Sequence, residues 1–165
     1  MGYYIGEVMN ACGVINIDFS DTTIVAVSGD GPNICGHLLL KTGSRGGYYF
    51  HVIELHGYPR YMSDSGYRRF LDESGKSELN RVDIAIPDQN GALTQLENLM
   101  SNKWTWMVLP NNCVSFVEEV LDAGGSDWSS ITNCPVLAAD VIPDTVQRFY
   151  QQMTAYISHL YGVPY

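Results

Sequence analysis

The sequence has few basic residues and no long apolar run, and each absence excludes a class of partner. Nine Lys and Arg residues stand against 18 Asp and Glu residues, which gives a formal net charge of −9. Without a basic cluster, neither nucleic acid nor an anionic membrane surface is an expected partner. No apolar run approaches the roughly 20 residues needed to cross a bilayer. The sequence therefore predicts no stable membrane insertion.

A cleaved export signal is also missing from the sequence pattern. The first residues, MGYYIGEVMNACG, contain neither a basic region nor a continuous apolar stretch, and a signal peptide needs both. The expectation is a protein made as a soluble cytoplasmic product.

Cysteines are few and scattered. Cys12, Cys35, Cys113 and Cys134 form no CxxC motif and no Cys/His pair at zinc-ligand spacing, so the pattern predicts neither a metal site nor a disulfide framework. A bridge between Cys12 and Cys35 is left open, because spacing alone does not bring two Cβ atoms together.

The order of patterns, strands first and helices later, predicts one α+β domain over residues 1–165. Short β-branched and aromatic stretches bounded by Gly, Asn and Asp indicate strands. We expect them at 3–8, 13–19 and 23–29 as a meander, at 37–41 and 48–55 as a hairpin, and at 81–87. Helical spacing and capping residues indicate helices. We expect these at 63–75, as a surface helix or lid, at 92–102, and at 143–162.

The best-defined helix begins at Cys113. Its apolar positions recur at helical spacing and place one face inward; they are Cys113, Phe116, Val117, Val120 and Leu121. Asn111 or Asn112 can cap the start, and the Gly124-Gly125 pair suits the end.

Two roles compete for Cys113. In the first turn of a helix, free N–H groups and the helix dipole favour the thiolate and lower the pKa of the thiol, as a nucleophile requires. The Cys113 backbone N–H could also stabilise an oxyanion. The alternative is an inert core cysteine on an apolar stripe.

Two histidines supply a candidate base. If the hairpin loop spans Thr42 to Gly46, Lys41 faces Gly47 and His37 lies opposite His51. Directly opposed residues project to one face of a sheet. A helix that packs its first turn over that face would bring Cys113 to His37, with His51 orienting the base.

These segments, GHLLLKTG, YYFHVIEL and NNCVSFVEEV, resemble the His, polar-residue and Cys segments of circularly permuted papain-like families. Those families include permuted NlpC/P60 domains and lecithin:retinol acyltransferase-like proteins. The resemblance covers about residues 36–125. It implies an antiparallel sheet packed against the helix that carries the cysteine, with Cys113 as nucleophile, His37 as general base and His51 as third member.

Further residues are candidates for secondary roles. His56 competes with His51 for the third position but lies in a turn. The long segment 56–80 could form a specificity element around three tyrosines, and aromatic or polar residues near the cysteine helix could line a cleft. The substrate-binding candidates are Tyr58, Tyr61, Tyr67, Trp106 and Asn112.

Three functions follow as hypotheses. The first, which the resemblance implies, is a thiol hydrolase that cleaves an amide in a peptidoglycan peptide. In one version of this hypothesis it is an antibacterial effector, delivered to a rival's periplasm and matched by an immunity or inhibitor protein. The second is an acyltransferase or phospholipase that uses the same Cys and His pair on lipid esters. The third is a binding module in which Cys113 is core. The catalytic versions require no metal or organic cofactor, because thiolate, imidazole and backbone N–H supply the chemistry.

Overall fold

The computed structural model describes residues 2–9, 15–29, 36–105 and 112–126. These residues form an antiparallel six-stranded sheet with helices on both faces, in the strand order β1-β6-β4-β3-β2-β7. The strands of the sheet are β1 (Glu7–Val8), β2 (Thr22–Val27), β3 (His37–Thr42), β4 (Tyr48–His51), β6 (Arg60–Ser63) and β7 (Glu78–Ile84). Two short strands, β5 (His56–Gly57) and β8 (Trp104–Thr105), pair as a separate ribbon.

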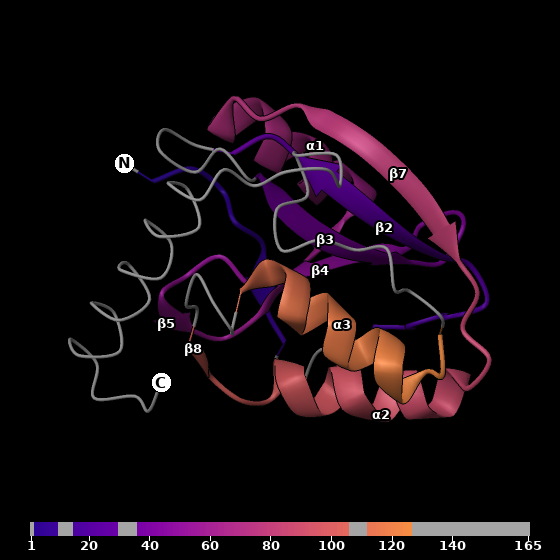
Figure 1. Ribbon diagram of the computed structural model, residues 1–165. Coiled ribbons are helices and arrows are strands. Elements are labelled where there is room, and N and C mark those ends of the chain that lie inside the picture. Colours follow the sequence, from indigo (N-terminus) through magenta and orange to yellow (C-terminus); the bar gives the residue numbers. More distant parts are fainter. Residues whose placement is uncertain (1, 10–14, 30–35, 106–111, 127–165) are drawn as a thin grey trace, which may run out of the picture.

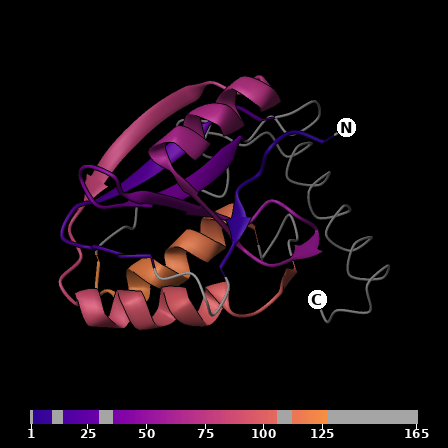
Figure 2. The same cartoon turned by 180° about the vertical axis from the view of Figure 1, so that it is seen from behind.

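The three helices of the described ranges cover the sheet, one on one face and two on the other (Figure 1). The helix α1 (Asp64–Ser74) lies on the first face, while α2 (Gln89–Met100) and α3 (Cys113–Ala123) pack together below the second. The view from behind gives the same layering (Figure 2). The described part of the chain is therefore an α+β structure, as the order of patterns predicted.

Strand alternation divides the interior into two apolar clusters. Leu38, Leu40 and Phe50 belong to the cluster that includes the inward faces of α2 and α3. Leu39 belongs to the cluster on the α1 side, together with Phe70. Successive residues of a strand point to opposite faces, and β3 lies in the interior of the sheet with both neighbours present, which explains why every residue of β3 is buried.

The strand at 23–29 and the helices at 63–75, 92–102 and 113 onward are confirmed, with small shifts of their ends. The hairpin is present, but its second strand ends at His51 instead of residue 55, and the strand expected at 3–8 is limited to Glu7–Val8. The strand expected at 81–87 begins earlier, at Glu78. Ser63 caps α1 by accepting from the Gly66 N–H, and Gly75 ends it with a left-handed backbone (φ 68°). The segment 63–75 is thus a helix packed on the sheet.

Two expectations about the first strands are wrong. Residues 15–19 form no strand, although their alternating apolar residues suggested one. The first strands do not meander, because β1 pairs with β6 while β2 pairs with β3 and β7. Pairing across the sheet outweighs proximity in sequence. The helix expected at 143–162 lies outside the described residues.

Within the described ranges, no helix combines the length and apolar character that a membrane crossing requires.

Candidate active site

His37 and His51 form a direct hydrogen bond in the interior. Nε2 of His37 lies 2.7 Å from Nδ1 of His51, and Nε2 of His51 lies 2.9 Å from the backbone carbonyl oxygen of Ile5. The two rings meet edge to face at a centroid distance of 4.9 Å, and both side chains are buried. The expected histidine pair is therefore present.

The register that brings the histidines together differs from the predicted one. Lys41 pairs with Tyr49 rather than with Gly47, because Thr42 continues the strand and the loop lies one residue later. Extending this register along β3 puts His37 and His51 on diagonal positions. A two-residue offset keeps them on the same face, where long or aromatic side chains still reach one another.

The Ile5 carbonyl determines which nitrogens carry protons. A carbonyl oxygen only accepts, so Nε2 of neutral His51 donates to it and Nδ1 of His51 holds a lone pair. His37 must then donate from Nε2 to that lone pair. Nδ1 of His37 is left with a lone pair, and it makes no hydrogen bond to any residue that the structure describes. His37 therefore presents the nitrogen that a general base needs.

Burial keeps both imidazoles neutral. Desolvation is the largest effect that holds the pKa of His37 well below its ordinary value of 6.5. Electrostatic interactions with His51 and with Lys76 lower it further. Desolvation likewise lowers the pKa of His51 to about 4, with smaller contributions from Arg60 and Lys76, although the Ile5 carbonyl opposes this shift. At neutral pH, the pair is therefore uncharged and its hydrogen-bond directions are fixed.

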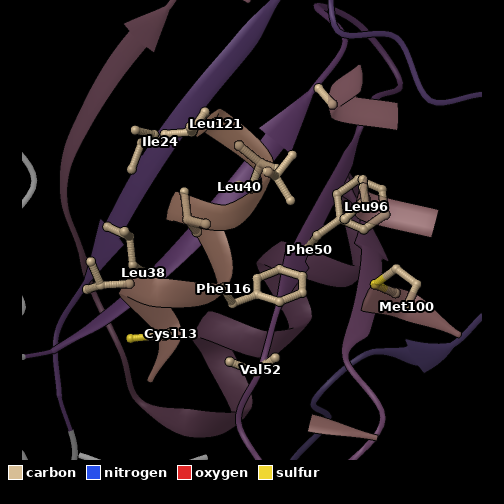
Figure 3. Packing of buried hydrophobic residues seen from close by; sticks show 14 of the residues in the cluster. Ile24, Leu38, Leu40, Phe50, Val52, Leu96, Met100, Cys113, Phe116 and Leu121 are labelled. Carbon is tan, nitrogen blue, oxygen red and sulfur yellow. The ribbon is translucent and has the colours of Figure 1, made fainter. Parts of the chain in front are cut away.

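Cys113 occupies the first turn of α3, where Asn112 caps the helix. The Asn112 side chain accepts from the backbone N–H groups of Val114 and Ser115, and the Ser115 hydroxyl accepts from the Asn112 N–H, which completes a capping box. Cys113 is a free thiol, 5% exposed, and it packs beside Leu38 (Figure 3). The predicted helix start is confirmed.

The expectation of a lowered thiol pKa at Cys113 is wrong. Burial raises it to about 11, although hydrogen bonding from the backbone N–H groups of Leu38, Cys113 and Val114 acts in the opposite direction. The helix start does favour the thiolate, but the desolvation penalty of a closed site is larger. In the resting protein, the cysteine is therefore a thiol and not a preformed thiolate.

The expectation that Cys113 and the histidines lie over the same face of the sheet is wrong. Both imidazoles contact the ring of Phe70 on the α1 side, at centroid distances of 6.5 Å and 5.4 Å, whereas Cys113 belongs to the cluster on the α3 side. Their point of approach is the start of β3, where the Leu38 amide that acts on the sulfur follows His37 directly. No hydrogen bond joins the sulfur to either ring among the described residues.

The alternative third residue, His56, lies in the β5–β8 ribbon. Its Nδ1 is 2.8 Å from the Thr105 hydroxyl, and its strand pairs with β8 rather than with β3. His51, not His56, makes the contact with His37 that a third member requires.

The predicted substrate-binding residues do not gather at one place. Tyr67 is buried on the α1 side, stacked on Tyr49 at 4.1 Å, with its hydroxyl donating to Glu78. Tyr61 packs against the other cluster, and its ring meets that of Tyr48.

The remaining candidates have different settings. Tyr58 is exposed, with the Lys103 ammonium over its ring, and Asn112 uses its side-chain oxygen as the helix cap. Trp106 lies outside the described residues, as do Cys12, Cys35 and Cys134 with the possible Cys12–Cys35 bridge.

Two contributors to the site escaped the sequence analysis. Ile5 acts through its backbone carbonyl, which carries no residue-type signal. Phe70 packs edge to face against His51, and the apolar face of α1 indicated only that this side chain is buried.

Among the described residues, no group of three or more His, Cys, Asp or Glu side chains could hold a metal ion. Comparison with protein-family models, with curated proteins and with solved structures finds no match for this chain.

Proposed function

We propose that this protein is a cysteine hydrolase of the permuted papain-like type, which cleaves an amide bond with Cys113 as nucleophile and His37 as general base. The observation that carries the proposal is the chain of hydrogen bonds from His37 through His51 to the Ile5 carbonyl. This chain leaves Nδ1 of His37 as a proton acceptor, one residue from the amide that acts on the Cys113 sulfur.

The proposed reaction proceeds through an acyl-enzyme. As the Cys113 sulfur attacks the amide carbon, its proton passes to Nδ1 of His37, and His51 stabilises the resulting imidazolium. In this proposal the Cys113 backbone N–H, which acts on the sulfur in the resting protein, donates to the developing oxyanion, because the Asn112 cap occupies the next two amides. His37 then returns the proton to the leaving amine, and water hydrolyses the thioester.

The raised thiol pKa favours this concerted order over a resting ion pair. A neutral thiol beside a neutral imidazole loses its proton only as the carbon–sulfur bond forms. The proposed reaction therefore requires the sulfur and Nδ1 of His37 to meet at the start of β3 when substrate binds, since the two side chains lie on opposite sides of the sheet and no hydrogen bond joins them in the described structure.

The proposed substrate is a peptide amide of peptidoglycan, by analogy with permuted NlpC/P60 enzymes, and the proposed partner is an inhibitor protein that protects the producing cell. The analogy rests on the Cys and His segments and on their arrangement around one antiparallel sheet.

The test is digestion of purified peptidoglycan sacculi, with released fragments identified by mass spectrometry. We expect fragments from the parent protein and at least about 1,000-fold less from Cys113→Ala and from His37→Ala. His56→Ala is the matched control, because His56 lies in the separate ribbon, and it should retain parental activity.

Parallel incubation with phospholipid vesicles separates the lipid alternative. Cys113-dependent release of fatty acid, with intact sacculi, would replace the amidase proposal with an acyl-lipid one. Equal fragment release by the parent and Cys113→Ala would remove Cys113 from the chemistry. Absence of turnover on both substrates would favour the binding module.

A further inference from the structure

The N-terminal strap, residues 3–8, is anchored across α1 and the edge of the sheet. The Tyr4 N–H donates to Glu73 over 2.7 Å, and the Arg69 guanidinium lies 4.4 Å from the centre of the Tyr4 ring. The Tyr3 ring packs 6.1 Å from that of Phe70, and β1 pairs with β6. Contacts on both sides therefore fix the backbone that lies between them.

Ile5 lies in the middle of this strap, and its carbonyl is the last acceptor of the histidine chain. Without an acceptor at Nε2, neutral His51 could carry its proton on either nitrogen. If the proton moved to Nδ1, that nitrogen could no longer accept from His37, and His37 would reverse its own tautomer. Nδ1 of His37 would then carry a proton and could not act as a base.

We infer that the N-terminal strap is a positioning element of the active site, and that the Ile5 carbonyl holds the His51–His37 pair in its base-competent tautomer. The inference deepens the proposed function and rests on it for its catalytic consequence. Its structural content, the tautomer of two named imidazoles, is measurable without any substrate.

Gly6 offers a single-residue way to move the strap. Its backbone is left-handed (φ +94°), and an added Cβ would lie 2.8 Å from the Tyr61 carbonyl oxygen and 2.9 Å from Cγ of Met62. Gly6→Ala should therefore displace the strap from β6 and draw the Ile5 carbonyl away from His51. Gly2→Ala is the matched control, because a Cβ at Gly2 meets nothing within 4 Å.

The experiment is long-range ¹H–¹⁵N NMR of the histidine side chains at pH 7.5, which reports the protonated nitrogen of each ring. We expect both His37 and His51 to be protonated at Nε2 in the parent and in Gly2→Ala. In Gly6→Ala, we expect signals of the Nδ1-protonated forms, and about tenfold faster solvent exchange of the His51 Nε2 proton, which corresponds to the loss of one net hydrogen bond.

A second pair of variants keeps the test valid if Gly6→Ala fails to fold. Glu73→Ala removes the acceptor of the Tyr4 N–H, whereas Glu73→Gln keeps an oxygen at that place. We expect the tautomer change in Glu73→Ala and near-parental signals in Glu73→Gln.

Two outcomes would overturn the inference. Unchanged tautomers and exchange in folded Gly6→Ala or Glu73→Ala would mean that the strap does not fix the pair. An Nδ1-protonated His51 in the parent would contradict the hydrogen-bond assignment itself. Failure of the proposed hydrolase remains distinguishable, because tautomers that follow the strap in a protein inactive on sacculi would retain the positioning element and reject only the amidase.

Discussion

His51 makes the stability of the protein sensitive to acid. Its pKa is lowered from 6.5 to about 4, mainly by burial, so the unfolded chain binds a proton between these values while the folded chain does not. Stability from this residue is complete above pH 6.5 and is lost as the pH falls towards 4. The full difference is about 3 kcal/mol.

This loss can be measured by urea unfolding between pH 7 and pH 4. The parent should lose stability steeply over this window, and His51→Gln should lose less, with the remaining slope due in part to His37, whose pKa is also lowered. His56→Gln should follow the parent. Identical slopes in the parent and in His51→Gln would show that His51 is not buried as a neutral base.

Cys113 leads to a prediction about thiol reactivity at mildly alkaline pH. Because burial raises its pKa from 9.0 to about 11, the thiolate fraction near pH 8 is about 100-fold lower than that of an unperturbed thiol, one factor of ten for each pKa unit. Alkylation by iodoacetamide, followed at Cys113 by mass spectrometry, should be slower in the folded protein by at least this factor than in guanidinium. If instead Cys113 of the folded protein reacts fast, and its rate reaches a plateau below pH 8, the resting protein contains a thiolate–imidazolium ion pair.

At the scale of elements, Asn112 is predicted to act as a helix cap. Asn112→Ala removes the acceptor for two backbone N–H groups at the start of α3 and should cost about 1–2 kcal/mol in the free energy of unfolding. Asn112→Asp keeps an oxygen in place and should stay close to the parent. Thermal unfolding of both variants tests this, and a substrate-binding role alone would leave Asn112→Ala as stable as the parent.

The helix around Cys113 shows what the sequence could predict. Its apolar period and its Asn cap are local signals, and the structure confirms both. The hairpin was also local, and it placed His37 and His51 on one face. The observed pairing of β3 with β4 differs by two positions from the predicted one, because Thr42 continues the strand. The Gly-rich sequence of the loop does not determine at which residue the strand ends.

What the sequence could not predict depends on contacts between distant segments. The face that α3 covers is set by Leu38 and Leu40, which pack against it, so Cys113 approaches from the side opposite the histidine rings. The raised pKa of Cys113 follows from that burial. The Ile5 carbonyl is a backbone group brought in from 46 residues away, and no residue pattern marks it.

At the scale of the whole molecule, the layered arrangement determines how the site is held. The histidines project from strands in the interior of the sheet, Phe70 of α1 packs against their rings, and α3 carries the cysteine on the other side. Motion of α1 relative to the sheet would change the packing around the histidine rings, and motion of α3 would change the position of Cys113. The rigid central strands of the sheet therefore hold both the histidine pair and the helix that carries Cys113 in place.

Amide hydrogen exchange should show that the central strands of the sheet are more rigid than its edge. β3 lies between β2 and β4, whereas β7 has a described neighbour on one side alone and exposes Leu79 and Val82, each at 49%. Backbone amides of β3 should exchange only through global unfolding, and those of β7 should include a set that exchanges much faster through local opening. Exchange in β7 as slow as in β3 would mean that a further segment or a second chain pairs with this edge. In that case the sheet extends beyond the described strands, and its rigid centre shifts towards β2.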